Sequence, residues 1–495
     1  MELFGEMLTF AAGFFLLLAL ALALAFEFVN GFHDTANAVA TVIYTNTLKP
    51  VYAVVWSGCW NLIGVLVSSG AVAYSIVALL PVELVLHSGS GAGFAMIFSL
   101  LISAIIWNVG TWYLGLPASS SHTLIGSIMG VGVANSLMAG NGWVAGINWE
   151  QAYKIGSALL VSPLVGFCCA GLLLLLLKLL VRYPSLYQAP EGKNPPPIWI
   201  RGLLVLTCTG VSYAHGSNDG QKGMGLIMLI LVGVVPGAFA LNMELAPESA
   251  QKAIVQLHKV ATVVQPLAGA TTLEKDDAVK ELTAFVAPQG PKATDRTYAA
   301  IVTESQYVAD TFSKQPDIKS IPHDDRSTLR TDVYLVDESI NKLLKKKVVT
   351  GDDAKSLTDA KKNLDSMTKY IPLWVKVAVA LALGLGTMIG WKRIVVTVGE
   401  KIGKAHLTYA QGASAELVAY ATIQAADIYG LPVSTTHVLS SGIAGTMAAN
   451  RSGLQKETLI NILLAWVLTL PVCIFLGATL FSASLYVTFH IFGLH

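Results

Sequence analysis

The sequence reads GFHDTANA at residues 31–38 and GSNDGQKG at residues 216–223, each time at the end of a long apolar run. Both stretches place one aspartate, Asp34 or Asp219, among small and polar residues in a shared Gly-x-x-Asp frame. A carboxylate within apolar, membrane-length sequence is costly unless it pairs, binds an ion or faces a water-filled cavity. These two aspartate motifs are therefore the first candidate for a functional site.

The composition around the motifs is that of a membrane protein. Of the 495 residues, 54% are hydrophobic and 13% are charged, and the mean hydropathy is +0.60. Soluble domains carry about 25% charged residues. Residues 241–370 hold 37 of the 63 Asp, Glu, Lys and Arg residues, so the remaining chain is apolar enough for many spans of about 20 residues. The net charge of +1 does not indicate a nucleic acid partner.

The apolar runs predict an all-α polytopic membrane protein with roughly 10 to 12 transmembrane helices, depending on how broken segments are counted. A proline-rich connection is flanked by the basic residues Lys178, Arg182, Lys193 and Arg201, and the positive-inside rule places it in the cytoplasm. The predicted spans are residues 7–30, 37–48, 51–80, 92–114, 120–139, 155–181, 199–215, 221–242, 371–390, 408–428, 433–449 and 458–491.

The same boundaries divide the chain into five predicted segments. They are a first transmembrane repeat at 1–182, a linker at 183–198, the start of a second repeat at 199–242, a polar insert at 243–370 and the remainder of the second repeat at 371–495.

The polar insert is expected to form a small helical domain or extended helical hairpins. Apolar residues recur at three-and-four spacing over residues 248–264 and 298–312, which is typical of amphipathic helices. The insert carries no Gly-rich phosphate loop and no His/Cys cluster, so an interaction or spacer role is expected. Its length leaves the side of the membrane open, because charges in long loops do not determine topology.

Neither the cysteines nor the N-terminus indicates processing for an extracellular, disulfide-bonded protein. Residues 1–6 are acidic and lack the basic region of a cleaved signal peptide, so the first apolar run is expected to remain as a span. The cysteines all lie in apolar runs, without metal-binding or disulfide spacing, and are expected to be packing residues: Cys59, Cys168, Cys169, Cys208 and Cys473.

A second pair of stretches is more closely repeated than the aspartate motifs. Residues 115–122 read GLPASSSH and residues 430–437 read GLPVSTTH. Gly, Leu, Pro, the first Ser and the His are identical, and Ser or Thr is kept at the two positions between them. Such a repeat is unlikely to arise by chance, so the two halves of the chain are predicted to be a duplication.

The spacing of the motifs agrees with a duplication that later received the insert. Asp34 and Asp219 are 185 positions apart, whereas His122 and His437 are 315 apart. The difference of 130 positions is close to the length of the polar insert at 243–370. Repeated halves with Gly- and Pro-interrupted segments at matching positions are typical of secondary transporters with inverted repeats.

The repeated GLP motifs fit the chemistry of an oxyanion site. Gly-Leu-Pro ends one helix and lets the next begin with hydroxyls and free backbone N–H groups, and a helix N-terminus favours anions. Ser and Thr in membrane helices also pack helices or bond backbone carbonyls, but three in tandem, twice, favour binding. The hydroxyl candidates are Ser119, Ser120, Ser121, Ser434, Thr435 and Thr436.

The aspartate motifs suit the cation that travels with such an anion. Asp34 and Asp219 would not bind an anion directly when ionised. They suit a proton, Na⁺ or a divalent cation that travels with the anion, or a hydrogen bond to a protonated phosphate oxygen. Asn37, Asn218 and Gln221 supply amides that both donate and accept. The chain is therefore expected to bind an anion and a cation at the same place.

Three histidines near the motifs are candidates for carrying protons. His33 adjoins Asp34, so it could tune that carboxylate or carry the coupled proton. His122 and His437 could also carry protons, with a helix-cap or packing role as an equal alternative. Three further acids in apolar context are expected to support or pair helices, with a coupling role left open: Glu27, Glu416 and Asp427.

Both pairs of motifs resemble those of the inorganic phosphate transporter (Pit) family, especially its bacterial low-affinity members. The family signature is a Gly-x-Asn-Asp-x-x-Asn-Ala-like segment in each half, matched here by residues 31–38 and 216–223. The Ser-rich GLP segments, the repeated halves and the hydrophilic insert also match, so the resemblance covers nearly the whole chain.

The resemblance implies symport of phosphate with protons or with Na⁺, an inverted-repeat fold and a homodimer. The phosphate would travel alone or as a neutral complex with Mg²⁺ or another divalent cation, without a permanently bound cofactor. The implied phosphate-binding residues are Asp34, Asn37, Ser119, Ser120, Ser121, Asn218, Asp219, Gln221, Ser434, Thr435 and Thr436. The implied coupling residues are His33, Asp34, His122, Asp219 and His437.

Two departures from the family pattern bear on the coupling ion. The first copy has His33 where the pattern has Asn, and the second has Lys222 and Gly223 where it has Asn and Ala. A Na⁺ site built from that Asn would be incomplete here. Protons are therefore favoured over Na⁺.

The sequence thus predicts a proton-coupled phosphate symporter of the bacterial inner membrane that works by alternating access and accepts arsenate as an analogue. Its other partner would be the lipid bilayer. The alternatives are a Na⁺-coupled phosphate transporter, a transporter for another oxyanion such as sulfate, and a channel or receptor-like membrane protein. An enzyme is not expected, because the sequence shows no metal-ligand cluster and no pair of nucleophile and base.

Overall fold

The computed structural model describes residues 1–79, 90–192, 194–287, 290–315 and 317–487. Nearly all of these residues lie in helices, and the strands within them are β1, Glu2–Leu3, and β2, Glu6–Met7, which pair in antiparallel fashion. The chain forms two compact units. The smaller unit contains Met1–Leu16 and Met228–Tyr370, and the larger contains Leu17–Leu80, Gly91–Ile227 and Ile371–His495.

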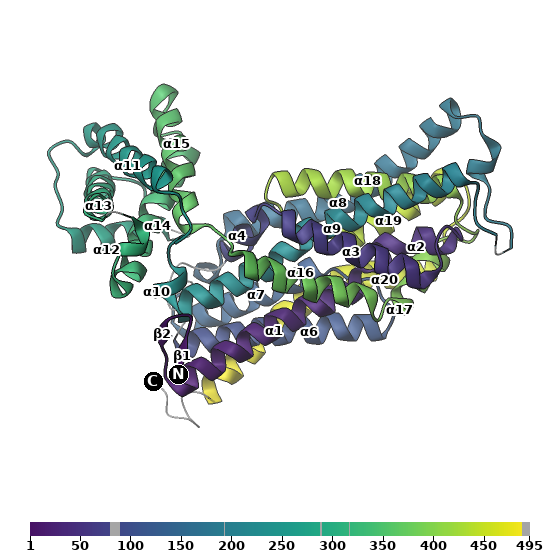
Figure 1. Cartoon of the computed structure of the whole chain (residues 1–495), viewed down its shortest axis with the longest axis horizontal. Coiled ribbons are helices and arrows are strands. Elements are labelled where there is room, and N and C mark those ends of the chain that lie inside the picture. Colours follow the sequence, from purple (N-terminus) through teal and green to yellow (C-terminus); the bar gives the residue numbers. More distant parts are fainter. Residues whose placement is uncertain (80–89, 193, 288–289, 316, 488–495) are drawn as a thin grey trace. The chain divides into compact units, whose positions relative to one another are not determined.

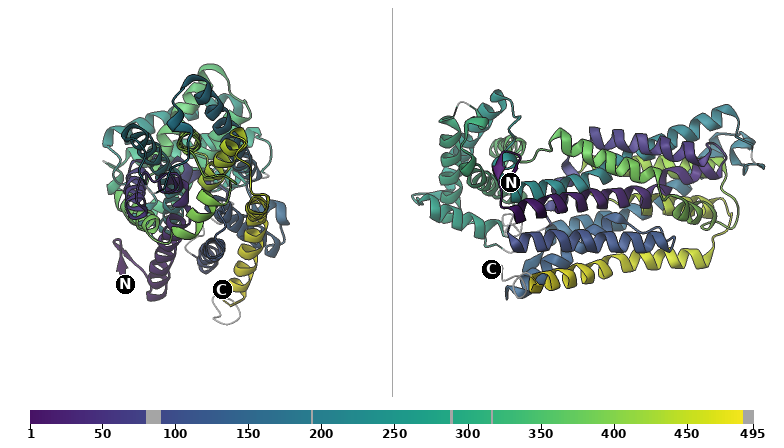
Figure 2. Two further views of the ribbon diagram at one scale, coloured as in Figure 1. Left: turned by 90° about the vertical axis from the view of Figure 1, so that its right-hand side faces the viewer. Right: turned by 60° about the horizontal axis from the view of Figure 1, so that its bottom comes forward.

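The larger unit contains the long apolar helices, which run side by side (Figures 1 and 2). The helices wholly or mostly in it are α1 Phe10–Asp34, α2 Ala36–Tyr44, α3 Pro50–Val67, α4 Ala71–Val77, α6 Gly91–Tyr113, α7 Ser120–Met138, α8 Trp149–Leu180, α9 Ile198–Val234, α16 Leu373–Met388, α17 Lys392–Glu400, α18 Tyr409–Ile428, α19 Thr435–Ala449 and α20 Lys456–Tyr486. Two short 3-10 helices, Trp143–Gly146 and Pro184–Tyr187, lie in its connections.

Several of these helices can cross a membrane by length and composition. Within the described residues they are Phe10–Tyr44, Pro50–Val67, Gly91–Tyr113, Trp149–Leu180 and Lys456–Tyr486. The chain is therefore a multi-pass and nearly all-helical membrane protein. The prediction of roughly 10 to 12 spans counted shorter and broken segments as well, and it stays a prediction.

The first aspartate motif interrupts its helix at Thr35 alone, so the predicted break over residues 31–36 is wrong for the rest of the motif. α1 ends at Asp34, α2 begins at Ala36, and Thr35 lies between them. The Thr35 hydroxyl donates to the Gly31 carbonyl at 2.7 Å and lies 3.0 Å from the Thr387 carbonyl, to which it also donates. The break therefore holds the motif against α16.

The second aspartate motif does not break its helix, so the predicted interruption between residues 215 and 221 is wrong. α9 runs from Ile198 to Val234 without interruption. Its glycines serve close packing instead: a Cβ at Gly216 would meet the backbone of Asn61, and one at Gly220 would meet Val65. The small residues that suggested a break therefore let α3 approach α9.

The two GLP motifs form the same turn. α6 ends at Tyr113 and α18 at Ile428, and Gly115 and Gly430 follow with φ of +68° and +63°. Glycine adopts this left-handed conformation without the steric cost that a Cβ brings. After the Pro, α7 begins at Ser120, as predicted, and α19 begins at Thr435, two positions after its predicted start at residue 433.

The helices that follow the GLP turns exchange partners between the halves. α7 packs against α20, which lies in the second half, and α19 packs against α8, which lies in the first. α8 follows α7 in the chain just as α20 follows α19. The two motif helices therefore have equivalent surroundings, which a duplicated fold predicts. The inverted orientation of the repeats remains a prediction.

One predicted span is divided in the structure. Residues 51–80 were expected to be continuous, but α3 ends at Val67 and α4 begins at Ala71. Gly70, with φ of +86°, forms the junction. The end of this span at residue 80, Lys193 of the linker and the end of the last span beyond residue 487 lie outside the described residues.

The smaller unit includes the residues of the predicted polar insert. Its core is formed by apolar residues at three-and-four spacing, such as Leu257, Val260 and Val264 in α11 and Val308, Ala309 and Phe312 in α13. Both helices cover the segments for which helices were predicted. The remaining elements are α10 Pro236–Phe239, α11 Pro247–Ala268, α12 Lys275–Val286, α13 Asp295–Ser313, the 3-10 helix Ile318–Ser320, α14 His323–Lys345 and α15 Gly351–Thr368.

Candidate functional site

Asp34 lies where the two GLP motifs meet. Its side chain is 2% exposed, and the Thr436 hydroxyl of α19 donates to Oδ1 at 2.6 Å. The Ser120 hydroxyl of α7 donates to Oδ2 at 3.4 Å, and His33 Nδ1 lies 3.1 Å from Oδ1. One carboxylate therefore contacts a hydroxyl from each half of the duplication, at the first turn of each motif helix.

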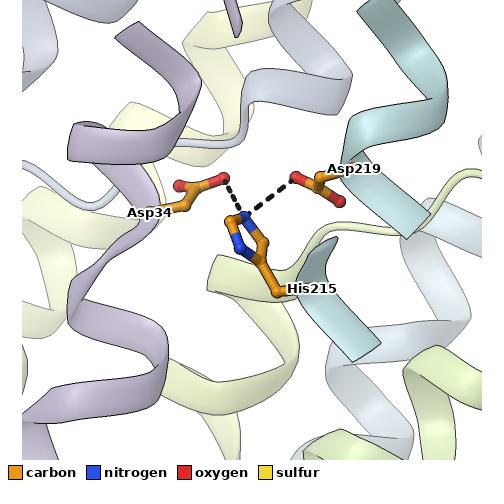
Figure 3. Close-up of side chains that lie close together, drawn as sticks. All are labelled: Asp34, His215 and Asp219. Atoms are coloured by element: carbon orange, nitrogen blue, oxygen red, sulfur yellow. Dashed lines mark ion pairs between the residues drawn. The ribbon is translucent and has the colours of Figure 1, made fainter. Parts of the chain in front are cut away.

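His215 connects the two aspartates (Figure 3). Its Nε2 lies 3.8 Å from Asp34 Oδ2 and 3.5 Å from Asp219 Oδ2, and all three side chains are buried. Its Nδ1 lies 2.9 Å from Asn61 Oδ1, which fixes the ring. The histidine and both carboxylates each offer a ligand atom within 4.8 Å of one another, so this set could hold a metal ion or share a proton.

Asp219 has a second partner in Lys222. The Lys222 Nζ lies 2.7 Å from Asp219 Oδ2, and the lysine is fully buried. The two residues are three positions apart on α9, a spacing that brings side chains together on a helix. The buried carboxylate thus has a basic partner at ion-pair distance, as buried charges require.

Asn37 joins the first aspartate motif to the second hydroxyl cluster. Its Nδ2 donates to the Thr435 hydroxyl at 3.2 Å and to the Thr436 hydroxyl at 3.0 Å. In the described part of the chain its Oδ1 is buried without a hydrogen-bond partner. The structure therefore brings five of the predicted phosphate-binding residues together, namely Asp34, Asn37, Ser120, Thr435 and Thr436.

Three of the predicted hydroxyls are used within the protein. Ser119 and Ser434 are N-caps, accepting from the backbone N–H of His122 at 3.2 Å and of His437 at 3.1 Å. The Ser121 hydroxyl donates to the Val433 carbonyl at 2.7 Å and so links the two motifs. These three residues support the site, and Ser120, Thr435 and Thr436 have hydroxyls facing Asp34 or Asn37.

The amides of the second aspartate motif bond to α4, α9 and the region around α18. Asn218 Nδ2 donates to the Leu431 carbonyl at 3.1 Å. Gln221 Nε2 donates to Asp427 at 2.5 Å, and its Oε1 accepts from the Val72 N–H at 2.9 Å. These bonds hold the second GLP turn and α4 against α9, and they occupy both ends of the Gln221 amide.

The two motif histidines contact each other. The rings of His122 and His437 lie 4.7 Å apart, and His437 stacks on Trp466 at 4.0 Å. Among the described residues, His122 Nδ1 and His437 Nε2 are buried without a partner. The rings therefore pack the two motif helices together and keep one nitrogen each available.

Of the further buried acids, Glu416 pairs helices, as expected. Glu416 of α18 accepts hydrogen bonds from Thr41 of α2 and from Thr207 of α9, the latter at 2.5 Å. Glu27 instead accepts from the Asn30 amide at 3.4 Å, within its own helix α1. The Glu416 contacts tie α18 to α2 and α9.

His215 and Asn61 were not among the predicted site residues. His215 directly precedes the second motif and lies 185 positions after Asn30, as Asp219 does after Asp34. Its spacing of four from Asp219 places both on one helix face, which is the signal that could have identified it. Asn61 lies in an apolar run without a motif, so the sequence offered no comparable signal for it.

Comparisons with known proteins agree with this arrangement. The sequence profile of the phosphate transporter family matches residues 30–477. The chain is 43% identical to the low-affinity inorganic phosphate transporter PitA of Escherichia coli, over 96% of this chain and 97% of that protein. It is 40% identical to the low-affinity inorganic phosphate transporter of Buchnera aphidicola subsp. Acyrthosiphon pisum, over 95% and 96% of the two chains.

A solved structure, the sodium-dependent phosphate transporter, is similar in fold. It has a TM-score of 0.52 and 19% sequence identity, over 95% of this chain and 98% of that chain. At this identity the likeness concerns the fold alone. Together with the family profile and the relatives, the duplicated motifs identify the chain as a member of the phosphate transporter family, whose members are transporters and not enzymes.

Proposed function

We propose that this protein imports inorganic phosphate together with protons, by alternating access, across the bacterial inner membrane. The observation that carries the proposal is the position of Asp34, whose carboxylate contacts Thr436 and Ser120, one hydroxyl from each half. The bacterial relatives are low-affinity inorganic phosphate transporters by name, which supports the same substrate and membrane.

Phosphate would bind where the N-termini of α7 and α19 meet the first aspartate motif. Helix N-termini favour anions because their first N–H groups lack intrahelical partners. The hydroxyls of Ser120, Thr435 and Thr436 and the Asn37 amide lie at this place. A carboxylate beside the anion favours phosphate over sulfate, because phosphate keeps a protonated oxygen near neutral pH that can donate to Asp34.

Protons would travel through the histidine between the carboxylates. Imidazole is the side chain whose charge changes near neutral pH, and His215 Nε2 lies within 3.8 Å of Asp34 and 3.5 Å of Asp219. His33 lies against the other oxygen of Asp34. Protonation of the cluster formed by Asp34, His215 and Asp219 would offset the negative charge of the incoming phosphate. It would thereby couple the movement of protons to the movement of phosphate.

In a second form of the proposal, a divalent cation is transported together with the phosphate. Asp34, His215 and Asp219 together offer ligand atoms that suit such an ion. The Lys222 ammonium, 2.7 Å from Asp219, competes for that carboxylate. We therefore propose a metal–phosphate complex as an additional substrate and the proton as the coupling ion.

Na⁺ coupling is the alternative that deserves a direct comparison. The structurally similar transporter is sodium-dependent by name, but Asp219 here already has a cationic neighbour. A channel or receptor-like protein is less well supported, because passive conduction needs no buried carboxylate pair with a histidine between them.

The test is uptake of radiolabelled phosphate by proteoliposomes of the purified protein. A proton gradient and a Na⁺ gradient are imposed in turn, with and without Mg²⁺, and sulfate and arsenate are added as competitors. We expect uptake driven by protons, blocked by arsenate and resistant to sulfate. Uptake that requires Na⁺, or that sulfate blocks as well as arsenate, would contradict the proposal.

A further inference from the structure

Lys222 stands at the position where the two aspartate motifs differ most in charge. It lies 185 positions after Asn37, the same distance that separates Asp219 from Asp34. Each residue is three positions after its aspartate. The second half of the duplication therefore carries an ammonium where the first half carries a neutral amide.

The two residues also make different contacts. The Asn37 amide donates to Thr435 and Thr436 and not to its own aspartate, whose neighbours are hydroxyls and histidines. The Lys222 Nζ instead lies 2.7 Å from Asp219 Oδ2. The neighbourhood of Asp34 is thus built from groups without a fixed charge, whereas the neighbourhood of Asp219 contains a fixed positive charge.

A second carboxylate, that of Glu27, packs against the residue that follows Lys222. The next residue is Gly223, and a Cβ there would clash with the side chain of Glu27. Glu27 is fully buried, and in the described residues its Oε1 has no hydrogen-bond partner. Asp219 Oδ1 is likewise buried without one. Removing the ammonium would leave buried acidic oxygens without a cation, which is strongly unfavourable.

We propose that the Lys222 ammonium is a built-in cation that takes the place of a small inorganic cation at Asp219. The second half of the site then needs no metal ion for its charge balance, and the coupled cation acts in the first half, at Asp34. This inference rests on the proposed phosphate symport, and it names Lys222 as the residue that excludes Na⁺ from the coupling.

The variant K222N tests this role of Lys222 directly. The substitution removes the ammonium and supplies an amide oxygen at the position that corresponds to Asn37. Carboxylate and amide oxygens are ligands for hard cations. The variant should therefore bind Na⁺, whereas the wild-type protein should not. K222Q offers the same amide on a longer side chain, and K222M removes the charge without supplying an oxygen.

The first readout is thermal stability of the full-length protein in detergent, in NaCl, KCl or choline chloride at equal ionic strength. A ligand that binds only the folded state raises its melting temperature. We expect NaCl to raise the Tm of K222N or K222Q by roughly 3 °C over choline chloride, with no such shift for the wild type or K222M. An equal response of K222M, or a Na⁺-dependent shift in the wild type, would overturn the inference, as would failure of both amide variants to fold in NaCl.

The second readout is phosphate uptake by proteoliposomes. Wild-type uptake should be indifferent to Na⁺, and K222N or K222Q should be stimulated several-fold by Na⁺ over choline. If the wild type takes up no phosphate under any gradient, the proposed function fails. If the wild type transports phosphate while the amide variants respond to Na⁺ in neither readout, the proposed function stands and the role of Lys222 is wrong.

Discussion

The two aspartates of the duplicated motif contact different kinds of side chain. Asp34 contacts the hydroxyls of Ser120 and Thr436, and Asp219 contacts the ammonium of Lys222. His215 lies within 4 Å of both. A duplicated pair thus supplies one carboxylate that faces the two hydroxyl clusters and one whose charge is compensated from within the protein.

The position of His215 leads to a prediction about coupling. His215→Gln keeps a hydrogen-bonding side chain but cannot carry a proton at this point. We expect proteoliposomes of the variant to exchange labelled phosphate across the membrane while losing proton-driven accumulation at least tenfold. The matched control is His406→Gln, because His406 is exposed. Wild-type accumulation by His215→Gln would show that the proton takes another route.

Single residues of the site were predictable where a motif marked them. Asp34, Asn37 and the hydroxyls of Thr435 and Thr436 follow from the repeats, and the structure places them together. The bonds of Gln221 to Asp427 and Val72 were not predictable, because both partners are far away in the sequence. A motif shows which residues are polar in an apolar setting, but not which partner each one selects.

At the scale of elements, the site depends on two helix N-termini held in the same way. Ser119 caps α7 and Ser434 caps α19 through the N–H of the residue three positions on. Neighbouring hydroxyls at Ser120 and Thr436 face Asp34 instead. The same short motif thus divides its hydroxyls between building the helix end and lining the site.

This division predicts different effects for adjacent serines and threonines. Ser119→Ala or Ser434→Ala removes a cap, which costs about 1 kcal/mol, so the Tm should fall in either variant. Ser120→Ala and Thr436→Val each remove a hydrogen bond to the buried Asp34 carboxylate, so the Tm should fall in these variants too, but only they should also raise the KM for phosphate. Thermal unfolding and initial uptake rates check both outcomes. A cap variant that raises only the KM would show that Ser119 or Ser434 contacts phosphate directly.

The close approach of α3 to α9 leads to a second prediction at this scale. A Cβ at Gly216 would meet the Asn61 backbone, whereas one at Gly202, in the same helix, would meet nothing within 4 Å. Gly216→Ala should lower the Tm by several degrees and displace Asn61 from His215. Gly202→Ala should leave the Tm unchanged or raise it, because Ala favours a helix by about 1 kcal/mol over Gly. Equal Tm values for the two variants would contradict the tight packing.

Elements with a distinctive stop signal were predictable, and elements without one were not. Gly-Leu-Pro placed the start of α7 correctly and that of α19 within two residues, because a left-handed Gly and a Pro two positions later both oppose a continuing helix. The glycines of residues 216–223 suggested a break and instead lie in the continuous helix α9. A glycine needed for close packing cannot be distinguished from one needed for a turn without knowing the neighbouring helix.

At the scale of the whole molecule, the smaller unit has an acid whose ionisation opposes folding. Glu304 of α13 is fully buried, and neither carboxylate oxygen has a hydrogen-bond partner in the described residues. Burial, with Asp332 nearby, raises the pKa of Glu304 from 4.5 to about 8, and Lys275 offsets this only in part. The folded state therefore keeps a proton that the unfolded state releases between these pH values.

The stability of this unit should consequently fall as the pH rises from about 4.5 to about 8. Glu304→Gln should remove that loss and slow amide hydrogen exchange of α13 and α14 at pH 8, measured by mass spectrometry on the full-length protein. The control is Glu248→Gln, since Glu248 is exposed. Identical exchange in Glu304→Gln and wild type at pH 8 would rule out a buried, proton-holding Glu304.

The organisation of the whole chain was the most predictable part. Composition separated the apolar sequence from the charged residues 241–370, and the offsets of 185 and 315 positions between the repeated motifs indicated a duplication. The exchange of partners, with α7 against α20 and α19 against α8, could not be predicted. It depends on how the two halves pack, and one sequence contains no information on which of several apolar helices meet.

The central claim is that phosphate and protons move together through Asp34. It is tested most directly in proteoliposomes that contain a pH-sensitive dye, to which phosphate or sulfate is added without a preset gradient. We expect phosphate, but not sulfate, to acidify the interior for the wild type. Neither anion should do so for Asp34→Asn reconstituted to the same level with an unchanged Tm. Acidification by Asp34→Asn at the wild-type rate, or phosphate entry into wild-type vesicles without any proton movement, would contradict the account.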